Sequence, residues 1–267
     1  MEIIAPLGPD SPRAAAVLFD FDGTLSTLRR GWEGVMRPLM LEMIAGNLEP
    51  DGALIREVDE YIDQSTGIQT IHQMKWLSDM VHAHRPGLGV PTDPWWYKAE
   101  YNRRLMKPVQ ARIDEIASGK KTPDEFLVKG SRAFLEELAR RGVPVYVASG
   151  TDHADVAREA GVLGVMKYFA VVAGAPEGRE DCSKEAVLRQ LVTEKALSGG
   201  ELAVIGDGKV EIRLGRSLGA KALGLASDEA AREGINRAKR TRLIAAGAHA
   251  ITGDFLDFEA ILHWMGL

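Results

Sequence analysis

Two carboxylates stand at the end of a short apolar run, and their spacing could hold a metal ion. Residues 14–19 are apolar, and Asp20 and Asp22 follow them two positions apart. Gly23 permits a sharp turn, so the first carboxylate and the backbone carbonyl two residues later can face one point. Oxygen ligands in this arrangement suit a hard divalent cation, and Mg²⁺ is the natural candidate. The alternative is a simple turn after a strand, since Asp and Gly are ordinary turn residues.

A hydroxyl group ends a second apolar run. Residues 143–148 are followed by Ser149 and Gly150, and Thr151 or Asp152 could cap a helix that begins there. A hydroxyl group and free backbone N–H groups at a helix start form an anion site, and phosphate is the anion such sites commonly take. A serine that only makes a turn is the alternative interpretation.

A third carboxylate site and a lysine complete the set. Asp207 follows the mainly apolar run 201–206 and stands between two glycines. The glycines would let the backbone approach a ligand closely. Glu211 lies one helical turn further on and faces the same way. Lys184 falls in the first turn of a predicted helix, where a cation gains nothing from the helix dipole. The position makes more sense if Lys184 points at an anion.

The apolar runs that precede these residues predict parallel strands. Uninterrupted apolar runs suit central strands covered on both faces, and ligands bind beyond the carboxyl ends of such strands in open α/β sheets. Further strand-like runs cover residues 168–173, 221–225 and 248–252. The sequence therefore predicts an α/β fold with a mainly parallel sheet and its chemistry at one edge.

A long insert interrupts this pattern. Residues 29–128 contain no strand-like run, and helical periodicity covers residues 36–44, 55–62, 71–81 and about 95–117. Four of the five tryptophans lie in the insert, and we expect them to pack a small core rather than contact a ligand. The pattern predicts a helical domain at 29–128 and a core domain formed by residues 1–28 and 129–267.

Composition is typical of a globular protein in a reducing compartment. The chain has 267 residues and 45% hydrophobic content, enough for a large α/β core with a smaller companion domain. The one cysteine, Cys182, excludes an intramolecular disulfide and a multi-cysteine zinc site. The start has no leader-like pattern and no run reaches eighteen apolar residues, so we expect a cytoplasmic protein without a membrane partner.

The charge balance argues against a nucleic-acid partner. The net charge is −5 and the isoelectric point is near 5.8, whereas binding to a phosphate backbone needs clustered Lys and Arg. The one basic cluster lies at residues 232–242, where interleaved apolar residues indicate a solvated helix face. The sequence makes no prediction about the oligomeric state.

In chain order, these groups resemble the four motifs of the haloacid dehalogenase (HAD) superfamily. The matching residues are Asp-Phe-Asp-Gly-Thr at 20–24, Ser149, Lys184, and Gly-Asp-Gly at 206–208 with the following acid Glu211. The match covers residues 14–28 and about 129–267, and the insert resembles no family that we can name. The resemblance implies a Rossmann-like three-layer core with an α-helical cap inserted after the first motif.

The resemblance also implies roles for the carboxylates. Asp20 would be the nucleophile and form an aspartyl-phosphate, a covalent intermediate known for carboxylates. Asp22 would protonate the leaving oxygen and later deprotonate the attacking water, while its backbone carbonyl binds Mg²⁺. Asp20 and Asp207 would be the side-chain metal ligands. Glu211 would reach the metal through water or position the loop.

The resemblance also implies which residues contact the substrate. Ser149 and Lys184 would hold the transferring phosphoryl group, where charge spreads over three oxygens. Further contacts are expected from Thr24, Gly150, Arg29, Arg30 and Trp32. For the last three, surface or core roles are the alternative. The implied substrate is a small phosphorylated metabolite.

Three functions follow from this site. The leading one is a Mg²⁺-dependent phosphomonoester hydrolase, because the dehalogenases and phosphonate-cleaving enzymes of the superfamily lack an acid at the position of Asp22. A sugar phosphomutase would use the same chemistry but needs cations that hold a bisphosphate, and the candidates are Arg29, Arg30, Lys75, Arg103 and Arg104. The third is a binding protein that retains the fold without catalysis. The intact set of acids argues against it.

Overall fold

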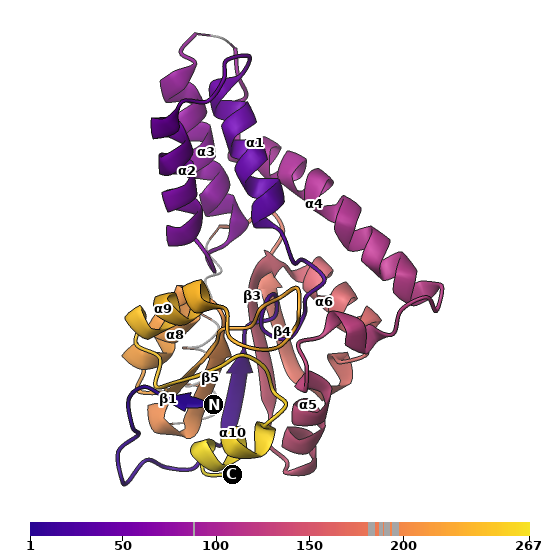
Figure 1. The fold of residues 1–267 in the computed structure, drawn as a ribbon, viewed down its shortest axis with the longest axis vertical. Helices are drawn as coiled ribbons and strands as arrows, with labels where there is room; N and C mark the ends of the chain where they lie inside the picture. Colours follow the sequence, from indigo (N-terminus) through magenta and orange to yellow (C-terminus); the bar gives the residue numbers. More distant parts are fainter. Residues whose placement is uncertain (88, 181–184, 187–188, 190–192, 194–197) are drawn as a thin grey trace.

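The chain forms a central sheet flanked by helices, with a separate group of helices at one end (Figure 1). The structure is a computed structural model that describes residues 1–267 except 88, 181–184, 187–188, 190–192 and 194–197. Lys184 and Cys182 therefore lie outside the described residues. In the part of the chain that is described, no helix is long and apolar enough to cross a membrane.

Among the described residues, the sheet has seven strands in the order β1-β7-β6-β5-β2-β3-β4, and only β1 runs antiparallel to its neighbour. The strands are β1 (Glu2–Ile3), β2 (Ala16–Phe19), β3 (Val145–Asp152), β4 (Phe169–Ala175), β5 (Leu202–Gly206), β6 (Lys221–Leu225) and β7 (Ala250–Thr252). All six predicted strands are present. The two-residue β1 was not predicted, because it is too short to form an apolar run. The predicted α/β class with a mainly parallel sheet is confirmed.

Helices cover both faces of the sheet and make the three layers of a Rossmann-like core. The core helices are α5 (Ser131–Arg140), α6 (His153–Val162), α8 (Lys209–Ser217), α9 (Arg237–Ala245) and α10 (Phe258–Met265), with short 3-10 turns η1 (Pro123–Phe126), η2 (Met166–Tyr168) and η3 (Gly199–Glu201). Alternate residues of β2 face opposite layers, as the pleat requires. Phe19 packs with Phe134 of α5 and with Phe255, whereas Leu18 packs with Leu214 of α8.

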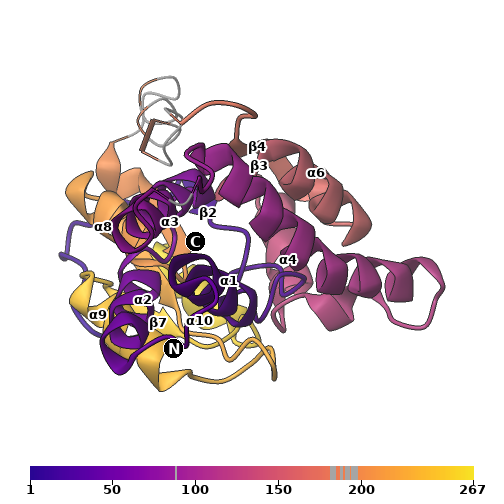
Figure 2. The same ribbon diagram turned by 90° about the horizontal axis from the view of Figure 1, so that it is seen from above.

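The helical cap contains α1 (Glu33–Ala45), α2 (Gly52–Gln64), α3 (Thr70–His84) and α4 (Pro94–Ala117). Figure 2 shows α2 and α3 above the side of the sheet that carries α8 and α9, and α4 on the side of β3, β4 and α6. The predicted α-helical cap is confirmed, while its limits at 29 and 128 stay a prediction. Of the cap tryptophans, Trp76 stacks on Tyr61 at 3.9 Å, but Trp96 is 45% exposed, so the expectation that all four pack a core is wrong.

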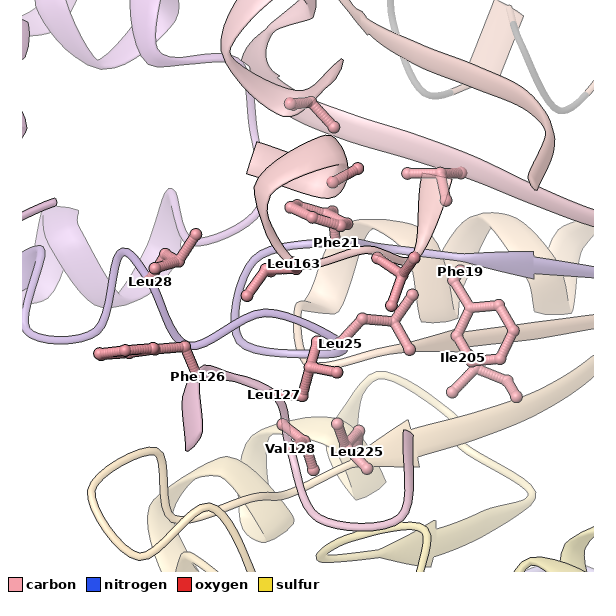
Figure 3. Close-up of a cluster of buried hydrophobic side chains, with 14 of the residues drawn as sticks. Phe19, Phe21, Leu25, Leu28, Phe126, Leu127, Val128, Leu163, Ile205 and Leu225 are labelled. Carbon is pink, nitrogen blue, oxygen red and sulfur yellow. The ribbon is translucent and has the colours of Figure 1, made fainter. Parts of the chain in front are cut away.

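The two connections between the sheet and the cap run side by side. The amide of Thr27 donates to the carbonyl of Phe126 at 2.8 Å, and the amide of Val128 donates to the carbonyl of Leu25 at 3.0 Å. Their apolar side chains share one buried cluster directly beyond β2 (Figure 3). The cap is therefore joined to the core by a paired, buried crossing just after the first carboxylates.

Phe19 anchors the strand that carries Asp20. It is fully buried, and its ring meets those of Phe134 and Phe255 edge-on at 5.9 and 6.0 Å. We expect Phe19→Ala to lower the free energy of unfolding by about 3–5 kcal/mol, because it leaves a cavity in a rigid core. Urea denaturation measures this change. The control is Leu256→Ala, which removes a side chain from a residue that is 59% exposed and should change stability by less than about 0.5 kcal/mol. Equal losses of stability in the two variants would contradict the interpretation that Phe19 anchors β2 in the core.

Candidate active site

A cavity of about 110 Å³ lies where the carboxyl ends of β2, β3 and β5 face the cap. From the core, its lining includes Asp20, Asp22, Gly23, Ser149, Gly150, Thr151, Asp207 and Glu229. From the cap and the connection to it, the lining includes Arg29, Trp32, Thr66, Gly67, Ile68, Thr70, Gln73, Tyr101 and Leu105. The structure thus brings together residues from three strands that lie up to 187 positions apart in the sequence (207 − 20).

Three carboxylates form a group that could hold a metal ion. Asp20, Asp207 and Glu211 each offer one oxygen, and these oxygens lie within 4.8 Å of one another. Gly23 makes the approach possible, since a Cβ atom there would lie 2.4 Å from Oδ2 of Asp207. A compact set of carboxylate oxygens is what hard cations such as Mg²⁺ bind. The residues therefore fit the metal that the sequence predicts.

Glu211 also organises the turn after β5. Its Oε1 accepts a hydrogen bond from the backbone N–H of Gly208 at 2.5 Å. A Cβ atom at Gly206 would lie 2.3 Å from Cγ of Glu211, and one at Gly208 would lie 2.8 Å from its Oε1. The two glycines that flank Asp207 thus make room for the Glu211 side chain. The sequence pattern had suggested that they make room for a ligand.

Two hydroxyl groups hold one oxygen of Asp22. Its Oδ2 accepts hydrogen bonds from Thr151 Oγ1 at 2.8 Å and from Ser149 Oγ at 3.4 Å. Thr151 was considered only as a helix cap, and nothing in its sequence context marks it as a partner of Asp22. Because β2 and β3 are adjacent, their ends bring these groups together. The arrangement fixes the direction of a carboxylate at the cavity wall.

A buried lysine, Lys239, and a partly buried glutamate, Glu229, lie beside Asp207. Lys239 Nζ donates to Asp207 Oδ2 at 2.7 Å and to Glu229 Oε1 at 2.6 Å. Burial lowers the pKa of Lys239, but the two carboxylates outweigh it and the net pKa lies above the ordinary value. For Glu229, desolvation is the largest influence, and it raises the pKa of this carboxyl group above its ordinary value. The prediction that residues 232–242 form a solvated face is therefore wrong for Lys239, which is only 8% exposed.

A loop of the cap forms one wall of the cavity. Residues 65–69 connect α2 to α3, and the carbonyl of Ile68 lies 2.8 Å from where a Cβ atom of Gly150 would be. On the other side, a Cβ atom at Gly67 would lie 3.3 Å from Oε2 of Glu211. The loop therefore touches the ends of both β3 and β5. Its sequence had indicated only a break between helices.

Ion pairs connect the cap to both sides of the cavity. Lys209 Nζ at the start of α8 lies 2.8 Å from Oδ2 of Asp63 in α2. Lys98 of α4 pairs with Asp152 at the end of β3, and its side chain is 9% exposed. These pairs lie on opposite sides of β2. They hold the cap over the carboxyl edge of the sheet.

The remaining predicted site residues lie in different surroundings. Thr24 is fully buried, and its Oγ1 lies 3.5 Å from Asp20 Oδ2. Trp32 and Arg29 line the cavity, whereas Arg30 is not among the lining residues and its backbone carbonyl accepts a hydrogen bond from Arg112 at 3.1 Å. Lys184 falls outside the described residues, so its role stays a prediction.

Comparisons with known proteins identify the family. A model of the haloacid dehalogenase-like hydrolase family matches residues 14–219, so the chain belongs to this family. No curated protein matches the sequence. The protein is a HAD-like hydrolase, as the order of its motifs predicts.

Solved structures share the fold at low sequence identity. A predicted phosphoglycolate phosphatase from Haemophilus somnus has a TM-score of 0.63 and 16% identity, with 94% of this chain and 98% of that one covered. A β-phosphoglucomutase from Clostridium difficile has a TM-score of 0.63 and 14% identity over 95% and 97%. A HAD-like hydrolase from Streptococcus pneumoniae has a TM-score of 0.56 and 19% identity over 93% and 98%. The similarity extends over the core and the cap.

The contact between Gly150 and the cap loop can be tested directly. Adding a methyl group at Gly150 would push Ile68 away, and overpacking of this kind costs about 1–3 kcal/mol. We expect amide hydrogen exchange in residues 65–69 to be at least about fivefold faster in Gly150→Ala. Gly161→Ala on α6 is the matched control, because a Cβ atom there has no neighbour within 4 Å among the described residues. Unchanged exchange in Gly150→Ala would show that the loop does not rest on this edge.

Proposed function

We propose that the protein is a Mg²⁺-dependent phosphomonoester hydrolase that acts through an aspartyl-phosphate on Asp20. The observation that carries the proposal is that Asp20 and Asp22 line one cavity. Asp20 also belongs, with Asp207 and Glu211, to the set of three carboxylates that could hold a metal ion. Asp20 is 6% exposed and lines a cavity of about 110 Å³, and this limited contact with water suits a nucleophile. Membership of a hydrolase family supports the reaction class.

The reaction has two steps that use Asp20 and Asp22 in turn. A carboxylate oxygen of Asp20 attacks phosphorus, the bond from phosphorus to the ester oxygen breaks, and Asp22 gives that oxygen a proton. A water molecule then attacks phosphorus, the bond to Asp20 breaks, and Asp22 takes the water's proton. Ser149 lies at the same edge and could donate a hydrogen bond to a phosphoryl oxygen.

Asp20, Asp207 and Glu211 would hold Mg²⁺ in this scheme. When bound, the ion would neutralise negative charge that builds up on the phosphoryl oxygens. Lys239 already offsets part of the charge of Asp207, at 2.7 Å. The chain's own residues therefore supply the nucleophile, the proton donor and the place for the ion.

The cations of the cap favour hydrolysis over a phosphomutase. A mutase needs a second anion site for its bisphosphate, and four of the five candidate cations are paired with carboxylates: Lys75 with Glu180, Arg103 with Glu100, Arg104 with Glu42 and Glu100, and Arg29 with Glu159 and Asp155. Arg29 is the one cation among the described residues that line the cavity. Its charge is already matched, so the cavity suits a single phosphate.

The size of the cavity limits the substrate. Ligand sites usually measure about 300–1,000 Å³, and this one has a volume of about 110 Å³ with the cap loop in place. A phosphoryl group fills much of that space. We therefore propose a small phosphorylated metabolite with a leaving group of few atoms, bordered by Trp32, Tyr101 and Leu105.

Phosphate release tests the proposed activity. We expect the wild type to release phosphate from small phosphomonoesters with Mg²⁺ and not with EDTA, and Asp20→Asn to lose at least about 10³-fold in rate, because the amide is a poor nucleophile. Asp59→Asn is the control, since Asp59 pairs with Arg37 on the cap surface. Both variants should melt within a few degrees of the wild type. Turnover that survives Asp20→Asn would contradict the covalent route.

Metal binding can be measured without turnover. We expect Asp207→Asn to weaken Mg²⁺ binding at least about tenfold in isothermal titration calorimetry, because it removes a charged oxygen ligand. Asp254→Asn serves as control, since the carboxylate accepts backbone hydrogen bonds from Gly234 and Leu256 and is not part of the carboxylate group found among the described residues. Mg²⁺ affinity that is the same in all three proteins would show that Asp207 is not a ligand.

A further inference from the structure

Glu159 is a fully buried glutamate on α6, outside the set of residues that the motifs predict. The Arg29 side chain holds it through Nε at 3.1 and 3.2 Å from its two oxygens and through Nη2 at 2.6 Å from Oε1. Burial raises the pKa of Glu159 to about 7, although Arg29 opposes the shift. A charged group without contact to water is costly unless it is paired, so these two residues form one unit.

The other side of this unit faces Asp22. Arg29 Nε lies 3.8 Å from Oδ1 of Asp22. That oxygen is buried and accepts no hydrogen bond from any residue that the structure describes, whereas Oδ2 is held by Thr151 and Ser149. The guanidinium is thus the charged partner of the one carboxylate oxygen that the hydroxyl groups leave unmatched.

The Arg29 side chain is held by carboxylates of α6 rather than directed at a ligand. Two of its three side-chain nitrogens are engaged by carboxylates of α6, since Nη2 also donates to Asp155 Oδ2 at 2.9 Å. Burial lowers the pKa of Arg29, but Asp22, Glu159 and Asp155 together raise it above the ordinary value. With Glu159 fully buried, the position of the guanidinium is set by the packing of α6.

We propose that Glu159 is a positioning residue that acts through Arg29 to hold Asp22 in the orientation required of the acid and base. The inference rests on the proposed function, because it takes from it the role of Asp22. It adds a residue 137 positions away from Asp22 (159 − 22) that touches neither substrate nor reacting atoms. It also assigns Arg29 to the support of Asp22 instead of to substrate binding.

The leaving group decides whether this positioning matters. An alkoxide leaves only if Asp22 delivers a proton as the phosphorus–oxygen bond breaks, whereas acetate leaves unprotonated. Ethyl phosphate and acetyl phosphate are close in size and differ in this respect. The ratio kcat/KM reports the steps up to departure of the leaving group, so the later attack of water does not enter it.

We expect Glu159→Gln to lower kcat/KM for ethyl phosphate at least about tenfold. The kcat/KM for acetyl phosphate should stay within about threefold of the wild-type value. The control Glu137→Gln removes a carboxylate that pairs with Arg140 and Arg141 on α5, away from the cavity, and should change neither. Equal losses on both substrates in Glu159→Gln would overturn the inference, since damage to the fold or to phosphate binding affects both alike.

A double variant separates positioning from stability. Replacing a buried ion pair by apolar side chains of similar size is often neutral for folding. Arg29→Met with Glu159→Met removes the fully buried charge together with its partner but leaves Asp22 and Asp155 without Arg29, so it should melt below the wild type, remain folded at the assay temperature by circular dichroism, and show the same selective loss on ethyl phosphate. Wild-type activity on ethyl phosphate in this variant would overturn the inference. If the wild type releases phosphate from neither compound nor from any phosphomonoester, the proposed function itself fails.

Discussion

The parallel register of β2 with its two neighbours is the constraint on which the rest of the site depends. Phe19 is paired with Val147 of β3 and with Ile205 of β5, so the three strands run in register up to the residue that precedes Asp20. The residues that follow are therefore brought to one edge, with Asp20 in the middle. A slip of one residue would turn each side chain to the other face and disperse the site. The apolar packing of Phe19 on one face and Leu18 on the other holds that register.

Buried charge shapes the site on both sides of Asp20. Arg29 with Glu159 stands behind Asp22, and Lys239 with Glu229 stands behind Asp207. A buried ion has to be paired, so each of these side chains is held in one place by its partner. The cap then closes over the carboxylates through its ion pairs and the loop 65–69. The result is a small cavity lined by largely buried charges, where electrostatic interactions are stronger than in bulk water.

Local pattern was sufficient for most of the fold. Six strands were predicted because each is a short apolar run, and the cap helices were predicted because their apolar residues recur at helical spacing. The motif residues Asp20, Asp22, Ser149 and Asp207 could be placed at one sheet edge because each follows a predicted strand. Trp96 and the basic segment 232–242 were misjudged, since burial depends on what packs against a helix and not on its own sequence.

The sequence by itself determined the order of the strands along the chain, the helical insert and the residues whose chemistry points to phosphoryl transfer. The tertiary structure decided which side chains support them. Thr151, Glu159 and Lys239 carry no local signal, because a threonine after a strand, a glutamate in a helix and a lysine in a basic segment are common everywhere. Their partners lie 129, 130 and 32 positions away. Contacts of this kind exist only after the sheet has brought distant segments together, and their energy comes from burial that no local window contains.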